Sequence, residues 1–229
     1  MAMYNGAAFV RPQVESILAQ LSAEDELVVV DDASSDESPA ILSGIKDARL
    51  HVRRNERNLG VLQTFERALG LARGEIVFLS DHDDIWLHGK MAKALEVFAS
   101  HPDVTMVASD ALLIDDEGRT LSESFFSVRG RFAGGFIRNF VKNKYLGCTL
   151  SFRRAMLRRF LPIPRDVPMH DIWFGLLNEI YGRTYFIDEP LVAYRRHRRN
   201  ASPLVHRGPG QILLWRARLA KNIALRVLR

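Results

Sequence analysis

Residues 27–36, Leu27-Val28-Val29-Val30-Asp31-Asp32-Ala33-Ser34-Ser35-Asp36, join a short apolar run to a polar one. The apolar run is rich in β-branched residues, the pattern of a strand that is buried on both faces. The serines and acids that follow are helix-capping residue types, so a helix is expected to run to about residue 43. This stretch therefore predicts a strand that leads into a helix, the building unit of a parallel α/β sheet.

Strand and helix patterns alternate on both sides of this unit. Apolar residues at helical spacing occupy residues 10–21, 61–72 and about 89–100. Strand patterns occupy residues 50–53, 76–79 and 104–108. The alternation predicts an α/β fold of the Rossmann-like, doubly wound type, with a mostly parallel sheet and helices on both faces. Only Met1-Ala2-Met3 precede the turn-like Tyr4-Asn5-Gly6, so the first strand is expected to be truncated.

The second half of the chain is less regular. Residues 116–136 are polar and rich in Gly, Ser and Arg, which predicts a mobile loop. Strands are expected near residues 149–152, Tyr185 and Val192, and helices at about 153–160 and 171–181. No repeat or break in composition marks a second domain. We therefore expect one domain over residues 1–205, followed by a basic amphipathic helix over residues 206–229.

The composition is that of an ordinary globular protein. Hydrophobic residues make up 47% of the 229 residues and charged residues 26%, which excludes wholesale disorder. No apolar run approaches the roughly 18 residues that a membrane span needs. The start of the sequence has no signal-peptide pattern, and the single cysteine, Cys148, excludes an internal disulfide. Both observations predict a cytoplasmic location.

Charge is unevenly distributed along the chain. All 27 acidic residues lie at or before Glu189, whereas the last 40 residues carry ten Lys and Arg residues. The net charge of +5 thus divides into −5 (22 minus 27) for residues 1–189 and +10 for the rest. The basic tail favours an anionic partner, while the acidic body argues against nucleic acid.

One helical stripe of apolar residues runs through this basic tail. Its members are Ile212, Trp215, Leu219, Ile223 and Val227. A basic helix of this kind suits the surface of an anionic membrane, so residues 211–229 are a candidate for peripheral contact with the inner face of the membrane. The alternative is a terminal helix that packs on the core of the domain.

Acidic residues follow three predicted strands at their carboxyl ends, where open α/β sheets bind ligands. They are Asp31 and Asp32, then Asp81, Asp83 and Asp84, and then Asp110. Crowded carboxylates repel one another unless a cation offsets the charge, and oxygen ligands suit Mg²⁺ or Mn²⁺. The group at residues 81–84 is therefore a candidate metal site. Its alternative is a solvated turn that caps the next helix.

Seven short motifs resemble, in order, those of family 2 glycosyltransferases with the GT-A fold, near the rhamnosyltransferase-like branch. They are Tyr4-Asn5-Gly6, residues 28–36, Asn58-Leu59-Gly60, residues 80–86 with Lys90, Gly147-Cys148-Thr149, His170-Asp171 with Trp173, and residues 194–197 with Asn200. The resemblance covers residues 3 to about 202. It implies a nucleotide-sugar-binding half over residues 1–110 and an acceptor-binding half over residues 111–205.

The resemblance also implies a divalent cation, Mn²⁺ or Mg²⁺, that neutralises a leaving diphosphate. Asp83 is the implied direct ligand, and Asp81 meets the ribose or reaches the metal through water, with Asp84 adjacent. His197 is implied to reach the metal or the diphosphate from the far side. Its alternative is an exposed side chain with no role, which is usual for a histidine in a basic segment.

The remaining implied roles concern the nucleoside, the diphosphate and the acceptor. Nucleoside contacts are implied for Tyr4, Asn5, Asp32, Asn58 and Gly60, although Asn58 also suits a simple turn. The guanidinium groups of Arg195, Arg196 and Arg198 suit phosphate oxygens. Asp171 is implied to be the general base that deprotonates the acceptor hydroxyl, and its alternative is a helix N-cap.

Taken together, the sequence predicts an inverting, metal-dependent glycosyltransferase of cell-surface polysaccharide synthesis. The expected donor is a dTDP- or UDP-sugar, and the expected acceptor is a glycan or a lipid-linked precursor. Two other classes stay open, a non-catalytic degenerate transferase or membrane-associated binding module, and a sugar-phosphate nucleotidyltransferase. The latter would need a Gly-rich, basic phosphate loop, which residues 4–8 do not provide.

Overall fold

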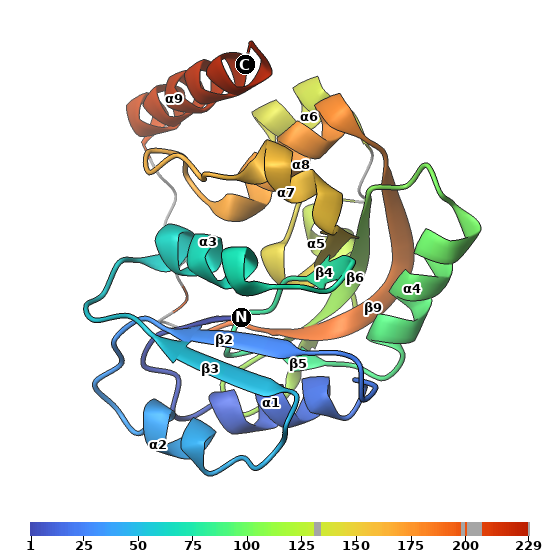
Figure 1. Ribbon diagram of the computed structural model, residues 1–229. Helices are drawn as coiled ribbons and strands as arrows, with labels where there is room; N and C mark the ends of the chain where they lie inside the picture. The colour runs from blue at the N-terminus through green and yellow to red at the C-terminus, as the bar shows by residue number, and fades with distance from the viewer. Residues whose placement is uncertain (131–133, 198–199, 201–207, 229) are drawn as a thin grey trace.

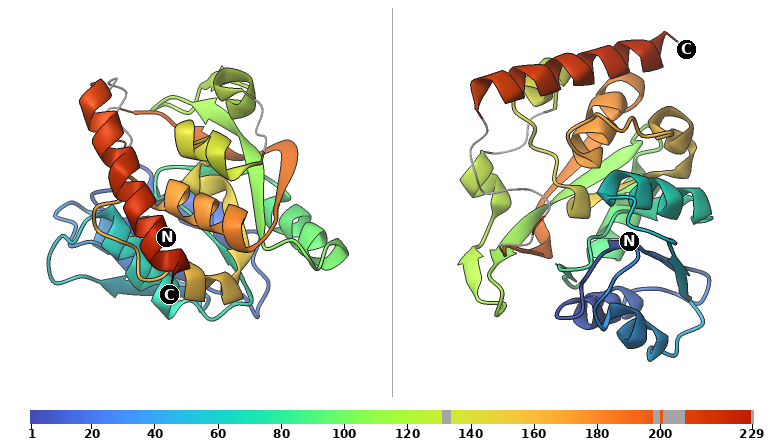
Figure 2. Two further views of the ribbon diagram at one scale, coloured as in Figure 1. Left: turned by 90° about the horizontal axis from the view of Figure 1, so that it is seen from above. Right: turned by 90° about the vertical axis from the view of Figure 1, so that its left-hand side faces the viewer.

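The computed structural model describes residues 1–130, 134–197, 200 and 208–228. Its strands form two sheets that are covered by helices, as Figures 1 and 2 show. The α/β class predicted from the sequence is confirmed. The two sheets meet at one parallel bridge between Ala2 and Asp81.

The first sheet is wholly parallel and has the order β1-β2-β3. Its strands are β1 (Ala2–Met3), β2 (Leu27–Asp31) and β3 (Leu50–Arg54). Helices α1 (Val10–Leu18) and α2 (Ser38–Ser43) cover one face, and α3 (Val61–Leu71) lies on the other (Figure 1). Apolar side chains of α1 and α2 pack against Leu27 and Val29 of β2, which explains the apolar run at residues 27–30.

The second sheet is mixed and has the order β4-β8-β6-β9-β5, with β7 paired to β6. Its strands are β4 (Ile76–Phe78), β5 (Ile85–Trp86), β6 (Met106–Ile114), β7 (Thr120–Ser122), β8 (Leu150–Arg153) and β9 (Thr184–Arg195). Only β6 and β9 pair in parallel, and the other pairs are antiparallel. The predicted parallel arrangement thus holds for the first sheet and for one pair of the second.

Helices cover both faces of the second sheet. Helix α4 (Lys90–Ser100) packs on one face through Ala94 and Phe98. The other face carries α7 (Leu157–Phe160) and α8 (His170–Tyr181), whose side chains Phe160 and Phe174 make edge-to-face contacts with Phe152. Shorter elements are α5 (Phe125–Arg129), α6 (Phe136–Val141) and two 3₁₀ turns, Gly147–Thr149 and Arg154–Met156.

Two expectations for the second half are wrong. The segment predicted as a mobile loop, residues 116–136, contains β7 and α5 in its described part, while residues 131–133 of that prediction lie outside the described residues. Asp110 anchors the described part, since its carboxylate accepts hydrogen bonds from Phe126 N (3.0 Å) and from the Ser124 hydroxyl. Asp110 is therefore a structural residue. The two strands predicted near Tyr185 and Val192 are one strand, β9, whose pairing with β6 is interrupted by register shifts.

Helix α9 (Pro209–Val227) lies across the top of the molecule in Figure 1 and packs on the domain. Leu219 is fully buried and Ile223 is 5% exposed, both in the main core. Arg226 donates hydrogen bonds to three backbone carbonyls near α7 and lies over the Trp173 ring. The docked alternative for the basic tail is thus what the structure shows. The predicted helix start at residue 206 lies outside the described residues.

Within the described residues, no helix combines the length and the apolar character that crossing a membrane requires.

Candidate functional site

A cavity of about 670 Å³ lies at the carboxyl ends of β1, β2 and the segment after β4. Eight of the residues singled out in the sequence line it: Tyr4, Asn5, Asp32, Asn58, Gly60, Asp81, Asp83 and His197. They come from five separate segments of the chain. Asp84 and Asp171 do not belong to the lining, although Met169, close to the start of α8, does.

Asp32 holds the segment after β3 against the end of β2. Its side chain is 3% exposed, and its Oδ1 accepts hydrogen bonds from Asn55 Nδ2 (2.7 Å) and Leu59 N (2.8 Å). Its Oδ2 accepts one from Gly60 N (2.9 Å). Gly60 has a φ of +84°, a conformation that favours glycine. Asp32 thus shapes the wall of the cavity on which Asn58 and Gly60 lie.

We expect Asp32→Asn to destabilise this wall. An asparagine has one acceptor oxygen, so its NH₂ group would face an N–H donor that the carboxylate now satisfies. The expected cost is about 1–3 kcal/mol of unfolding free energy, measured by urea denaturation. Glu56→Gln, an exposed change in the same loop, is the control and should stay within about 0.5 kcal/mol of the parent. Equal stability of the two variants would contradict the assignment.

The turn at Tyr4-Asn5-Gly6 is fixed by the segment that follows β2. Asn5 has a φ of +48°, and its Oδ1 accepts a hydrogen bond from Ser35 N (2.9 Å). The backbone N–H groups of Asn5 and Gly6 donate to the hydroxyls of Ser34 (2.9 Å) and Ser38 (2.8 Å). Tyr4, by contrast, is 47% exposed at the cavity edge. The turn is therefore rigid, while the Tyr4 ring has room to meet a ligand.

Gly6 lets His82 approach the turn closely. A Cβ atom built on Gly6 would lie 2.2 Å from His82 Cδ2, which is shorter than any real contact. His82 also lines the cavity, although the sequence suggested no role for it. The close approach of the two residues joins the first turn to the acidic segment after β4.

Asp83 and His197 face each other on the cavity wall. Asp83 Oδ2 lies 2.9 Å from His197 Nε2 and 3.3 Å from Asn200 Nδ2. Burial favours the neutral form of Asp83, but the His197 hydrogen bond and the positive charges nearby hold its pKa below the usual value. Residues 114 positions apart in the sequence thus form one O/N pair of possible metal ligands.

Arg195 and Phe9 position this pair. The Arg195 side chain donates from Nε to the Asp83 carbonyl (2.9 Å), and its backbone N–H donates to Asp84 Oδ1 (2.9 Å). The Phe9 ring stacks on His197, with ring centroids 5.1 Å apart, and Arg195 lies over the same ring. Arg195 is itself buried and bound to backbone carbonyls, so its expected role as a diphosphate ligand is replaced by a structural one. Arg198 lies outside the described residues.

Asp84 and Asp81 interact electrostatically with a buried lysine. Lys90 is 2% exposed, and its Nζ donates to the Cys148 carbonyl. Burial and the charge of Asp83 raise the pKa of Asp84 to about 7, and burial with three neighbouring carboxylates raises that of Asp81. Burial also raises the pKa of the Cys148 thiol well above its usual value, which makes it an unsuitable nucleophile.

Asp171 opens helix α8. Its Oδ1 accepts a hydrogen bond from Ile172 N (2.6 Å), and burial raises its pKa to about 6. The charge of Asp171 is also one of those that raise the pKa of Asp81, so the two carboxylates lie within electrostatic range. Met169 occupies the N-cap position and makes no side-chain capping bond, so Asp171 is not the N-cap that the alternative interpretation required.

The acidic segment fits a hard divalent cation. One oxygen each of Asp81 and Asp84 and the Cys148 sulfur lie within 4.8 Å of one another, and Asp84 Oδ2 is buried without a hydrogen-bond partner among the described residues. Only Asp81 and Asp83 of the three acids line the cavity, together with His197. Asp81, Asp83 and His197 are thus the candidate ligands that face the cavity, whereas Asp84 and Cys148 of the close group do not line it.

Two features of the site escaped the sequence analysis. Phe9 lies just before α1 and outside the apolar stripe of that helix, and no pattern in the sequence marks it as part of the site. Lys90 was noticed only as part of a motif, and nothing in its spacing indicates that it is buried beneath the acids.

Comparisons with known proteins show which family this chain belongs to. Residues 1–161 match the model of glycosyl transferase family 2. The chain is 26% identical over 209 residues to an uncharacterised glycosyltransferase of Nostoc sp., which covers 86% of this chain and 63% of that protein. It is 27% identical over 197 residues to the putative teichuronic acid biosynthesis glycosyltransferase TuaG of Bacillus subtilis, which covers 84% of this chain and 75% of TuaG.

The fold also resembles a solved structure. S. aureus TarS 1–349, crystallised in complex with UDP-GlcNAc, superposes with a TM-score of 0.76 at 20% sequence identity over 100% of this chain and 65% of that one. The likeness supports a GT-A-like fold. The chain spans less than two thirds of the Nostoc protein and of TarS. Because the family model covers 161 of its 229 residues, the chain belongs to glycosyl transferase family 2.

Proposed function

We propose that this chain forms the donor-binding and catalytic core of an inverting, metal-dependent glycosyltransferase. The observation that supports it most is the cavity at the strand ends, where Asp32, Asp81, Asp83 and His197 come together from distant segments. In this proposal residues 1–110 hold the nucleotide sugar and residues 111–205 hold the acceptor. The cavity is also lined from the second half, by Met169, Tyr194, His197 and Asn200, so both halves contribute to it.

The cavity offers separate places for the parts of a nucleotide sugar. Asp32 with the 58–60 segment and the exposed Tyr4 ring suit the nucleoside, since they supply polar edges and an aromatic face. Asp83 and His197 suit a divalent cation, which would act as a Lewis acid on the diphosphate. Arg195 and Phe9 then serve to hold His197 in place.

Asp171 is the proposed general base. A carboxylate with its pKa raised to about 6 by burial is a better proton acceptor than an ordinary aspartate. The acceptor oxygen, deprotonated by Asp171, attacks the anomeric carbon while the bond to the diphosphate oxygen breaks. One displacement of this kind inverts the configuration at the anomeric carbon.

We propose UDP as the donor nucleotide. The support is the fold likeness to TarS, whose structure contains UDP-GlcNAc. A dTDP-sugar such as dTDP-rhamnose is the other donor considered, because the motifs resemble the rhamnosyltransferase-like branch. The family match names no nucleotide, so experiment decides between the two.

Calorimetric titration of UDP, dTDP and GDP into the protein tests the proposal directly. We expect UDP to bind with Mn²⁺ and to lose at least about tenfold in affinity with EDTA, because the diphosphate then faces Asp81 and Asp83 without a counter-charge. Preference for dTDP would move the donor to the dTDP-sugars. Absence of binding for all three nucleotides, with and without Mn²⁺, would refute the proposed activity.

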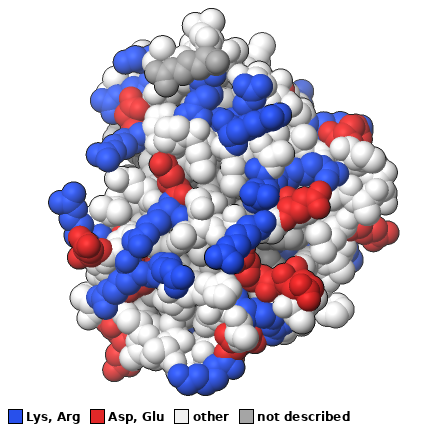
Figure 3. Space-filling view, in the orientation of Figure 1, with Lys and Arg blue, Asp and Glu red and all other residues white. Residues whose placement is uncertain are grey.

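The acceptor is proposed to be a cell-surface glycan or its lipid-linked precursor, in line with the name of the relative TuaG. The outer side of α9 and the neighbouring α6 suit contact with the inner, cytoplasmic face of a membrane. Leu213 and Ile137 are 72% and 78% exposed, and Arg216 links the two helices through the Val141 carbonyl (2.9 Å). Figure 3 shows more basic than acidic side chains over the upper part of this face, where α9 lies.

Lys221→Glu is expected to weaken binding to vesicles of anionic lipid by about tenfold, since it reverses a charge on the exposed side of α9. A point change is needed because deleting residues 211–229 would remove Leu219 and Ile223 from the core. Sedimentation with vesicles at 50 and 500 mM NaCl measures the binding, and Lys46→Glu, the same charge change at an exposed lysine after α2, is the matched control. A parent protein that ignores anionic vesicles at low salt would end the membrane proposal.

A further inference from the structure

His82 lies in the acidic segment after β4 and has no role in the proposed function. Its side chain is half-buried and lines the cavity of about 670 Å³ described above, here called the donor cavity, together with its chain neighbours Asp81 and Asp83. The ring nitrogens of His82 make no hydrogen bond to any other residue of the described chain. A polar ring with its bonding capacity unused is thus presented to a ligand of this cavity.

Contacts on two sides fix the position of this ring. Gln13 of α1 is fully buried, and its Nε2 donates to the Ser80 hydroxyl (2.7 Å) and to the Asp81 carbonyl (2.8 Å), so the backbone just before His82 is anchored. The three atoms nearest to a Cβ built on Gly6 are Cδ2, Nε2 and Cγ of His82, at 2.2, 3.0 and 3.1 Å. The Cδ2 edge of the imidazole therefore rests against Gly6, and the edge that carries Nδ1 is turned away from it.

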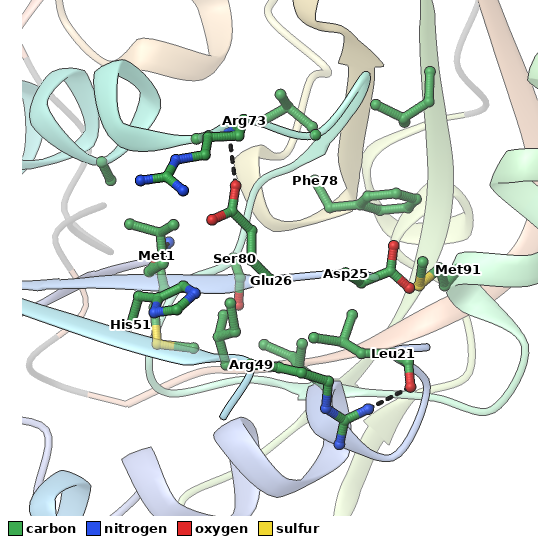
Figure 4. A pocket seen from close by; sticks show the side chains of 18 of the residues that line it. Met1, Leu21, Asp25, Glu26, Arg49, His51, Arg73, Phe78, Ser80 and Met91 are labelled. Atoms are coloured by element: carbon green, nitrogen blue, oxygen red, sulfur yellow. Dashed lines mark hydrogen bonds between the residues drawn. The ribbon is translucent and has the colours of Figure 1, made fainter. Parts of the chain in front are cut away.

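Only one cavity receives the His82 side chain. A second cavity, of about 690 Å³, begins at Ser80, and Figure 4 shows it with Phe78 and Met91 on its wall. His82 does not line that second cavity, although it follows Ser80 by two residues. The imidazole is therefore accessible to a ligand of the donor cavity and to no ligand of the other.

The position of His82 lies between the two ends of the proposed donor site. Asn5 belongs to the end that suits the nucleoside, whereas Phe9 stacks on His197 at the end that suits the cation, with ring centroids 5.1 Å apart. Gly6, which His82 touches, lies between Asn5 and Phe9 in the chain. The part of a nucleotide sugar that connects a nucleoside to a bound cation is its diphosphate.

A diphosphate at this point would find few other N–H groups. No Lys or Arg is among the described residues that line the donor cavity. The backbone N–H groups of residues 5–7 already donate to side chains of the segment after β2, at 2.8–2.9 Å. His197, the other histidine of the lining, is paired with Asp83 at 2.9 Å. His82 is thus the cavity imidazole whose N–H is available to an anion.

We propose that His82 is a donor-binding residue whose imidazole N–H donates a hydrogen bond to a phosphate oxygen of the nucleotide sugar, and that Gly6 keeps the ring in place for this contact. The inference rests on the proposed function, because it assigns one further contact of the same donor. A hydrogen bond to a charged phosphate oxygen is stronger than one between neutral groups. A side chain on Gly6 would push the ring away from its position.

His82→Leu and His82→Asn separate a hydrogen bond from mere filling of space, because the two new side chains have nearly the same shape and only asparagine keeps an N–H. With Mn²⁺ present, we expect His82→Leu to weaken UDP binding about tenfold and His82→Asn to stay within about threefold of the parent. Uridine, which lacks phosphate, should bind both variants as it binds the parent. Calorimetry measures UDP and ligand-observed NMR measures uridine; dTDP and thymidine replace them if the parent prefers dTDP.

His88→Leu is the matched control, since it makes the same change at an exposed histidine outside the cavity lining. It should leave UDP affinity within about twofold of the parent. Thermal denaturation of each variant checks that the fold is retained, and the loss expected for His82→Leu should occur without a lower Tm than that of His82→Asn.

A double-mutant cycle tests the part played by Gly6. Gly6 is not among the glycines with a left-handed φ, so an alanine there is opposed by the His82 ring and not by the backbone. Gly6→Ala should weaken UDP binding at least about fivefold in the parent but less than about twofold in the His82→Ala background, where the new methyl group has room. Equal effects in both backgrounds would contradict the link between Gly6 and His82.

Three other results would overturn the proposal while UDP binding by the parent, and with it the proposed function, stays intact. The first is parental UDP affinity in His82→Leu, and the second is an equal loss in His82→Leu and His82→Asn, which would reduce His82 to a space-filling residue. The third is an equal loss for UDP and uridine, which would place the contact on the nucleoside. A parent protein that binds no nucleotide would instead refute the proposed function, and this assignment with it.

Discussion

Asp83→Ala is expected to reduce turnover by about 10²- to 10⁴-fold and to abolish the Mn²⁺ dependence of UDP binding. Asp83 is 7% exposed and shares the cavity wall with His197, 2.9 Å away. Charge stabilisation of a leaving diphosphate by a held cation amounts to several kcal/mol, and each 1.4 kcal/mol changes the rate about tenfold. Sugar transfer with Mn²⁺ varied from zero to saturation measures the effect.

Three variants separate loss of the ion from loss of the fold. Asp83→Asn keeps an oxygen that can accept from His197 but removes the charge, so it should lose the metal dependence almost as fully as alanine. Asp116→Ala, an exposed acid on the segment that Arg195 holds, should retain parental activity. His197→Ala should weaken Mn²⁺ dependence less than Asp83→Ala, because a carboxylate contributes charge and an imidazole does not. Asp83→Ala with parental Mn²⁺ dependence would remove Asp83 from the metal site.

The gathering of acidic residues at the strand ends could be predicted from sequence because local patterns encode it. An apolar run such as residues 27–30 marks a buried strand, and the acids that follow it must emerge at the end of that strand. The same reasoning led to Asp81 and Asp83 after β4. Since parallel strands end at one edge of a sheet, residues from separate segments could be expected in one cavity.

The second sheet shows where local patterns fail. Strands β4 and β6 both pair antiparallel with β8, although helices separate these strands in the chain. No local sequence pattern indicates the direction of the neighbouring strand with which a strand will pair. The segment after residue 116 looked like a loop because its order depends on Asp110 of β6, whose carboxylate accepts a hydrogen bond from Phe126 N in the first turn of α5. Contacts of this kind are tertiary, so neither the stacking of Phe9 on His197 nor the burial of Lys90 could be predicted.

The position of Asp32 could be predicted from a local pattern, whereas its tertiary contacts could not. The sequence located it at the end of β2, yet its carboxylate is already engaged by Asn55, Leu59 and Gly60. A ligand would therefore meet an acid whose orientation is fixed. The side chain of such an acid is ordered on folding and not on binding, which would favour affinity for the nucleoside that we propose binds there.

Asp171→Asn is expected to lower kcat by about 10²- to 10⁴-fold while UDP affinity changes less than about threefold. The amide keeps the hydrogen bond from Ile172 N, which the carboxylate now accepts at 2.6 Å, but it cannot take a proton from the acceptor hydroxyl. Steady-state kinetics paired with UDP titration separates the two effects. Asp166→Asn, an exposed change five residues earlier, is the control. Equal loss of UDP affinity and kcat would assign Asp171 to donor binding.

The pH dependence gives a second, independent signature of the same residue. A base with a pKa of about 6 is protonated below that pH, so kcat of the parent should fall about tenfold per unit on the acid side of pH 6. The raised pKa also means that the folded protein binds more protons than the unfolded chain between about pH 4 and 6, so this group makes stability fall as pH rises through that window. At pH 7 the neutral Asp171→Asn should therefore be at least as stable as the parent. Loss of activity without loss of Tm, combined with a residual rate that no longer rises through pH 6, would identify a base, whereas a merely structural role would lower Tm.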